Sequence, residues 1–327
     1  MRVQRNLLPE NTEGWHGFLR DYFCDKDAIA TLEGDYVQLS LEWPSGIERH
    51  VDPELQSGLD WWGRGVSRAT MWSAAYRDGP ILTSLYDTWT LHSWSEWLAR
   101  TPVQRVKDVV LLHVDDHRDL GAPRLLVRDG TLVDAITGEL FNLYHPESVR
   151  SAINSGAIGM GSFMTPFIHE FPATQVRHLC QPPKSHRTTA SRLLPITVAD
   201  TLLDLGSERP AIDYLPNYVA SQGSYLVTPD ASIWAKGIEG RPALVHIDMD
   251  YFNNRYDGDS LWRERKEPLD PDLSSIFAKI DELLDALALS RVEIDDVTIA
   301  YSPGFFPAEY WQIADQRLRT GLHKILG

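Results

Sequence analysis

A cluster of ionisable side chains follows an apolar run in the segment "VVLLHVDDHRDL". Its potential ligands Asp115, His117 and Asp119 are spaced i, i+2, i+4, which in an extended chain places the three side chains on the same side. The intervening Asp116 and Arg118 would then point outward. His113 shares the inward parity one step earlier, so we expect it to lie behind the ligands or in the core. This spacing predicts half of a metal site.

A second apolar run, "ALVHIDMD", ends with Asp248 and Asp250 in the same i, i+2 relation. Active sites of open parallel sheets lie beyond the carboxyl ends of the strands, so the two clusters can face one crevice. Their four carboxylates raise one another's pKa and need a compensating positive charge, which two divalent metal ions would supply. A site dominated by carboxylates favours Mn²⁺, with Fe²⁺, Co²⁺ or Mg²⁺ as alternatives and Zn²⁺ less favoured.

The elements that must position these residues are short apolar runs typical of buried parallel strands. We predict such strands at residues 108–115, 243–250 and 296–303. Between the last two, residues 272–290 have apolar positions at helical spacing, behind Asp272 or Ser274 as N-cap. A strand, a helix and a strand in this order predict a right-handed crossover in a parallel sheet.

The rest of the chain elaborates one predicted α/β domain that spans residues 1–327. Residues 95–102 predict a short helix, and 36–43 an alternating strand at a sheet edge. Residues 1–80 are interpreted as an N-terminal elaboration rich in tryptophan. Residues 181–216, rich in Pro, Ser, Thr and Arg, predict an excursion over the surface.

Charge and composition restrict the partners. The 31 Lys and Arg residues against 46 Asp and Glu give a net charge of −15, which argues against sequence-independent binding of nucleic acid or anionic membranes. Two cysteines are too few for a disulfide framework and predict a reducing compartment. The first residues lack the apolar core of a signal peptide, so a cytoplasmic protein without membrane spans is expected.

With "DDHRD" and "HIDMD" the sequence resembles the arginase-like ureohydrolase superfamily, whose motifs are D-x-H-x-D and S-x-D-x-D. His246 stands where the family has the serine. The family also has a histidine about two dozen residues upstream, and His92 precedes Asp115 by 23 positions. The resemblance implies a three-layer α/β/α fold with a mostly parallel central sheet.

The resemblance also implies a ligand set for two Mn²⁺ ions. One ion would be held by His92, Asp115, Asp119 and Asp248, and the other by His117, Asp115, Asp248 and Asp250. The pair would lower the pKa of a bridging water and supply hydroxide at neutral pH. Asp119 would orient this nucleophile toward the guanidinium carbon and pass its proton on.

Two departures from the family concern the substrate. Free-arginine enzymes carry a glutamate where Ala300 stands and a proton-shuttling histidine where Gly159 stands. Together with "SPGFFP", this favours the divergent branch of peptide arginases, which convert arginine side chains of a precursor peptide to ornithine with release of urea. The alternatives are a ureohydrolase acting on agmatine or free arginine, an amide deacetylase with one zinc, and a non-catalytic peptide-binding module. A homo-oligomer stays open.

Residues for the remaining roles are less constrained by the sequence. The cationic substrate needs oxygen acceptors beyond the metals, and Glu309, Asp257 and Asp259 are the candidates. His145 and His169 are the candidates for a replacement proton shuttle.

Overall fold

A computed structural model describes residues 1–46, 50–216 and 223–327 of the chain. The described residues form an α/β fold around a twelve-stranded mixed sheet of order β4-β5-β15-β14-β6-β10-β13-β11-β12-β7-β8-β9. From one edge to the other, the strands are β4 (Ala75–Asp78), β5 (Ile81–Ser84), β15 (Glu293–Ala300), β14 (Pro242–Asp248), β6 (Val110–Val114), β10 (Gln175–Leu179), β13 (Ser224–Thr228), β11 (Thr189–Ala199), β12 (Glu208–Pro216), β7 (Leu125–Arg128), β8 (Thr131–Asp134) and β9 (Leu140–Phe141). The strands from β5 to β13 in this order pair in parallel, and those outside them pair antiparallel.

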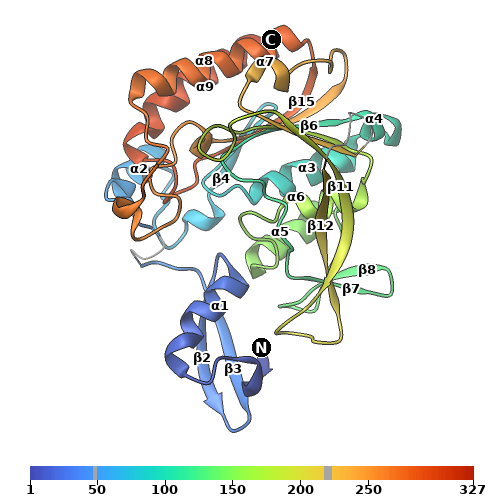
Figure 1. Ribbon diagram of the computed structural model, residues 1–327, viewed down its shortest axis with the longest axis vertical. Coiled ribbons are helices and arrows are strands. Elements are labelled where there is room, and N and C mark those ends of the chain that lie inside the picture. The colour runs from blue at the N-terminus through green and yellow to red at the C-terminus, as the bar shows by residue number, and fades with distance from the viewer. Residues whose placement is uncertain (47–49, 217–222) are drawn as a thin grey trace.

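Helices lie on both sides of the parallel strands. Those around the main sheet are α2 (Leu55–Trp62), α3 (Trp89–Arg100), α4 (Val103–Asp108), α5 (Pro146–Ser155), α6 (Met164–Glu170), α7 (Ala231–Trp234), α8 (Leu273–Ser290) and α9 (Trp311–Leu326). Figure 1 shows α7, α8 and α9 on one side of the central strands, and α3, α5 and α6 on the other.

Chain direction explains this division. The connections β5–α3–β6 and β6–α5–α6–β10 advance across the sheet in one direction, whereas β13–α7–β14 and β14–α8–β15 advance in the other. Right-handed crossovers of opposite direction place their helices on opposite faces. The order reverses at the neighbouring strands β6 and β14, so a crevice opens beyond their carboxyl ends.

The three predicted strands and the long helix are confirmed as β6, β14, β15 and α8. Helix α8 begins directly after Asp272, whose side chain accepts a hydrogen bond from the backbone N–H of Ser275. The predicted helix at 95–102 is the second half of α3, which begins at Trp89 and ends at Arg100.

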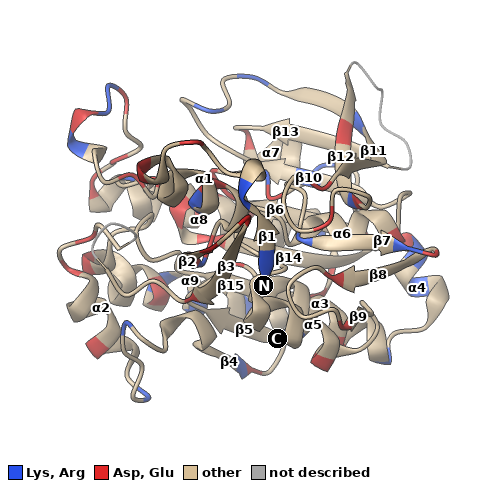
Figure 2. Cartoon of the chain, turned by 90° about the horizontal axis from the view of Figure 1, so that it is seen from below, with Lys and Arg blue, Asp and Glu red and all other residues tan. Residues whose placement is uncertain are grey.

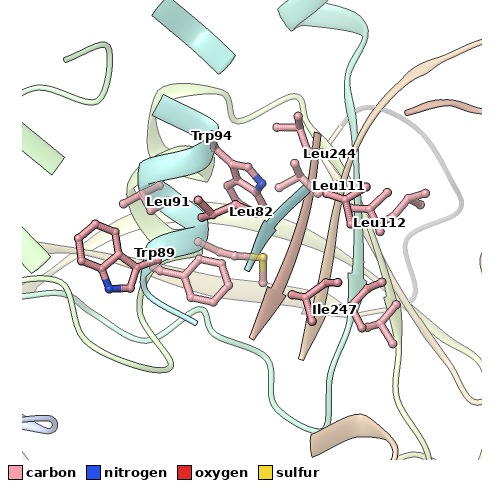
Figure 3. Close-up of a cluster of buried hydrophobic side chains, with 14 of the residues drawn as sticks. Leu82, Trp89, Leu91, Trp94, Leu111, Leu112, Leu244 and Ile247 are labelled. Carbon is pink, nitrogen blue, oxygen red and sulfur yellow. The ribbon is translucent and has the colours of Figure 1, made fainter. Parts of the chain in front are cut away.

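The core between α3 and the parallel strands is apolar. Figure 3 shows Trp94 and Leu91 of α3 above Leu82 of β5, with Leu111 of β6 and Leu244 of β14 beside them. All five side chains are at most 5% exposed. At roughly 25 cal/mol per Å² of buried apolar surface, this layer is a main contribution to the stability of the scaffold that carries the strand ends.

The N-terminal residues form a separate small sheet of order β1-β3-β2, made by β1 (Arg2–Gln4), β2 (Asp27–Glu33) and β3 (Tyr36–Glu42). Helix α1 (Trp15–Phe23) packs on it through Leu19 and Phe23, and this cluster is distinct from the main core. The predicted strand at 36–43 is therefore confirmed as β3, but its edge position is wrong, because β3 pairs on both sides. Alternation of buried and exposed residues is also what a central strand shows when only one face of its sheet is covered.

Within the 181–216 segment, β11 and β12 form an antiparallel hairpin that extends the main sheet beyond β13.

Short 3-10 turns occur at Arg5–Leu7, Thr12–Gly14, Met71–Ser73, Met249–Tyr251, Trp262–Glu264 and Ala308–Tyr310. Acidic and basic residues are interspersed over the elements seen in Figure 2. Within the described residues, we find no helix of the length and apolar character that a membrane span requires.

Candidate metal centre

Five aspartates converge on a cavity of about 420 Å³ at the carboxyl ends of the parallel strands. They are Asp87, Asp115, Asp119, Asp248 and Asp250. The other lining residues are His117, Arg118, Leu120, Gly121, Met160, Gly161, Tyr214, Ser302 and Phe305. The crevice expected at the reversal of strand order thus contains the charged residues of both sequence motifs.

The first motif follows β6 directly but does not continue as an extended strand. The backbone N–H of Asp115 still pairs with the carbonyl of Leu179 in β10, and the next residues form a bend. Asp119 has a φ of +53°, in the left-handed region. The bend brings Asp115, His117 and Asp119 to the cavity as predicted, although by a turn and not by strand alternation.

Arg118 and Asp116 were both expected to point outward, and the bend places only Asp116 so. Arg118, expected to point outward, lines the cavity. Asp116 does lie away from it, because its Oδ2 is 2.8 Å from Lys184 Nζ and accepts a hydrogen bond from the Asn254 amide at 2.7 Å.

The second motif is held by its own backbone and by Ser302, which follows β15. Asp248 Oδ1 accepts a hydrogen bond from the backbone N–H of Asp250 at 3.0 Å, and its Oδ2 accepts one from Ser302 Oγ at 2.6 Å. Asp250 Oδ1 in turn accepts a bond from the backbone N–H of Asp116 at 3.1 Å, which joins the two motifs directly.

The imidazole of His117 has its two nitrogens in different surroundings. Nδ1 lies 2.9 Å from Asp250 Oδ2 and 3.5 Å from Asp115 Oδ1, on the cavity side. Nε2 lies 3.0 Å from Asp257 Oδ1, which Lys184 Nζ also contacts at 3.1 Å. Burial alone would lower the pKa of His117, but Asp250 and hydrogen bonds to the surrounding carboxylates raise it well above its usual value.

The raised pKa values of the cavity's carboxylates indicate that a cation would be bound favourably there. Burial and then the neighbouring carboxylates raise the pKa values of Asp87, Asp115 and Asp248 well above the usual value. Burial raises that of Asp119 to about 6. Such shifts are those of carboxylates gathered without compensation.

Unpartnered oxygen atoms test whether metal ions fit. Asp87 Oδ1, Asp115 Oδ2 and Asp119 Oδ2 are buried and have no hydrogen-bond partner in the described part of the chain. A buried carboxylate oxygen without a donor is costly unless a cation binds it. One set of donor atoms within 4.8 Å of one another comes from Asp115, His117 and Asp250. Another comes from His113, Asp115, Asp119 and His246, but both nitrogens of His113 are engaged in hydrogen bonds. Oxygen donors with few imidazoles are suited to hard or borderline divalent ions.

His92 is the predicted ligand that the structure does not bring to this cavity. It lies on α3, its ring packs edge-on against Trp89, and the charged groups near it are Glu96, Glu147, Arg150 and Arg77. Glu147 and Arg150 belong to α5, so His92 lies toward α5 and not among the residues that line the cavity.

Asp87, which the sequence prediction missed, lines the cavity, whereas His92 does not. Asp87 follows β5, is 4% exposed, and acts electrostatically on Asp119, Asp248 and Asp250 through the cavity. The signal that could have found it is an aspartate closely following a short apolar run, "ILTSLYD", as in the other two motifs.

None of the predicted substrate-binding or proton-shuttle residues lines the cavity. Glu309 forms an ion pair with Arg255 at 3.0 Å, and Asp259 accepts a turn hydrogen bond from Leu261 on the surface. Asp257 lies behind His117, as described above. His145 is the exposed residue that precedes α5, and His169 bonds the carbonyl of Ala211 through Nε2 at 2.8 Å. The structure therefore does not bring these five residues to the cavity wall, and Asp257 alone contacts a residue of the metal motifs.

The two positions that depart from the family pattern lie beside the site. Ala300, at the end of β15, is the register partner of Asp248, so a methyl group stands next to the metal motif. Gly159 is packed so closely that a Cβ there would lie 3.2 Å from the carboxylate of Asp25.

Three buried histidines lie side by side on adjacent strands, and two of them hydrogen-bond the backbone of the first motif. His178, His113 and His246 are register partners on β10, β6 and β14. His178 Nε2 donates to the carbonyl of Asp115 at 2.9 Å, and His113 Nε2 donates to that of His117 at 3.0 Å. His113 Nδ1 is then the acceptor in its 2.9 Å contact with His246 Nδ1. Burial lowers the pKa of all three, so they are neutral.

No family model matches the chain, and no curated protein matches it either.

Proposed function

We propose that the chain is a dinuclear metal-dependent hydrolase with an arginase-like three-layer α/β/α fold, and that it cleaves the guanidinium of arginine side chains in a peptide to give ornithine and urea. The observation that carries the proposal is the convergence of five buried aspartates, three with unpartnered oxygens, on one cavity. The corrected ligand set is Asp87, Asp115, His117, Asp119, Asp248 and Asp250.

Two divalent ions would supply a strong nucleophile at neutral pH by lowering the pKa of water. Residues of the chain would move the proton and position the substrate. Asp119 lines the cavity with an unpartnered Oδ2, and its carboxylate would both hold an ion and pass on a proton. Phe305 gives the cavity an aromatic wall, against which a planar guanidinium can stack.

The shape and charge of the cavity support a guanidinium substrate. Its volume is within the range of ligand pockets, and its floor of carboxylates attracts a cation. Ala300 and Gly159 stand where the free-arginine enzymes have a glutamate and a histidine. Their absence at these two positions favours a larger arginine-containing ligand.

Urea release provides the test. Protein loaded with Mn²⁺ is incubated with an arginine-containing peptide, with free arginine and with agmatine, and urea is measured. We expect urea and ornithine from the peptide, and loss of both in Asp119→Asn. Comparable urea from free arginine would contradict the peptide assignment. Acetate released from an acetyl-lysine peptide, with one tightly bound zinc per chain, would support the deacetylase alternative, and peptide binding without turnover the non-catalytic one.

A further inference from the structure

Arg118 is a cation in the wall of a cavity whose acidic residues are five aspartates. It lies between the ligand residues His117 and Asp119, and its side chain is exposed at the cavity. Its guanidinium carbon lies 5.2 Å from the centre of the Tyr214 ring. In the described part of the chain, Arg118 forms no ion pair within 4.0 Å, and its side chain hydrogen-bonds that of Tyr214, so its remaining donors are available to a ligand.

Tyr214 fixes where this guanidinium lies. It is on β12, its register partner is Leu193 of β11, and its ring packs against Tyr225 of β13 at 5.8 Å. A guanidinium stacked on an aromatic face keeps its fork of N–H groups in one plane and loses little conformational freedom on binding. The hairpin of β11 and β12 therefore contributes directly to the wall of the site.

A fixed cation there restricts which guanidine compounds can bind. When the guanidinium of a substrate lies against the aspartates, the opposite end of the molecule passes the wall of the cavity. A carbonyl or carboxylate oxygen at that end would accept bidentate bonds from Arg118. An ammonium group at that end would be repelled by it.

We propose that Arg118, held by Tyr214, is the specificity-determining residue that selects guanidine substrates with a carbonyl or carboxylate oxygen at their far end and excludes those whose far end carries a cation and no such oxygen. The inference rests on the proposed function and names the part of its substrate that the metal ions do not contact.

Paired substrates test this assignment. Free arginine offers a carboxylate, Nα-acetyl-arginine amide offers carbonyl oxygens alone, and agmatine offers an ammonium. In Arg118→Gln we expect urea formation (kcat/KM) to fall about 10- to 100-fold for the first two, and to be unchanged or higher for agmatine. Arg118→Lys keeps the charge without the fork and should lie between. Arg187→Gln removes an exposed arginine of the 181–216 segment that does not line the cavity, and should match the wild type.

Binding provides a second measurement that does not depend on turnover. By calorimetry on Mn²⁺-loaded protein, Nα-acetyl-ornithine amide should bind more tightly than putrescine, and Arg118→Gln should reduce this difference. A loss confined to free arginine would identify the carboxylate as the recognised group, and a loss for both acceptor-bearing substrates the carbonyl oxygen.

The possible failures are distinct. Wild-type urea release from agmatine as efficient as from Nα-acetyl-arginine amide overturns the role of Arg118 and leaves the proposed function standing. An equal loss for all three substrates in Arg118→Gln also overturns it, because the residue would then be structural. Absence of urea from every guanidine compound overturns the proposed function and this inference with it.

Discussion

Replacing Asp119 by asparagine should change the stability of the metal-free and the metal-loaded protein in opposite directions at pH 8. Asp119 is 4% exposed and faces other carboxylates, so its ionised form is costly without a metal. Asparagine has nearly the same shape, carries no charge, and tolerates the left-handed backbone that a φ of +53° requires. The substitution therefore removes a charge with little backbone strain.

The size of the effect follows from the pKa. In the folded protein the pKa of Asp119 is raised from 3.8 to about 6, so the folded state holds the proton more tightly than the unfolded state. Its contribution to stability is full below about pH 4 and is lost as the pH rises through 6. Ionisation thus costs about 3 kcal/mol at pH 8. With an unfolding entropy of ~2.1 cal/mol/K per residue, this corresponds to a gain in Tm of about 4 °C for the metal-free variant.

Calorimetric unfolding measures both directions. Metal-free wild type should have a lower Tm at pH 8 than at pH 5, and the Asp119→Asn variant should show less of this decrease. Mn²⁺ at 100 times its Kd should stabilise the wild type by ~2.7 kcal/mol and the variant by much less. Asp259→Asn changes an exposed turn aspartate and serves as the matched control. A metal-free variant less stable than the wild type at pH 8, or one stabilised fully by Mn²⁺, would refute the reasoning.

Three further substitutions test the ligands and their support. Asp87→Asn should lower the number of Mn²⁺ ions retained per chain by elemental analysis, whereas His92→Asn should leave it unchanged; the reverse result would restore the ligand set inferred from sequence. Asp257→Asn removes the acceptor 3.0 Å from His117 Nε2 and should weaken Mn²⁺ binding about 10- to 100-fold in a titration, because a carboxylate behind a ligating histidine fixes its orientation. An unchanged affinity would mean that Lys184 or the packing alone orients the ring.

Sequence reasoning located the parts of the site that follow directly from local patterns. Asp115, Asp119, Asp248 and Asp250 were predicted together because each follows a long apolar run, and strand ends of a parallel sheet meet at one edge. The helix before β15 was predicted because its apolar spacing and its cap at Asp272 are both local features.

What the sequence did not reveal depends on pairing between distant segments. Asp87 follows the four-residue strand β5, whose place beside β15 is set by long-range packing and not by its own pattern. Tyr214 reaches the cavity only because β11 and β12 form a hairpin beside β13, which a polar, proline-containing segment does not predict. The spacing of His92 matched a family motif, but the beginning of α3 at Trp89 turns that position toward α5.

The three histidines at equal register favour the correct alignment of β10, β6 and β14. A slip of one residue between β6 and either neighbour would exchange inward and outward side chains, and would leave an imidazole of His113, His178 or His246 buried without its partner. Misaligned strands are therefore penalised at the same level of the sheet from which Asp115 and Asp248 project. The three histidines thus favour both the correct strand register and the correct position of the aspartates that follow the strands.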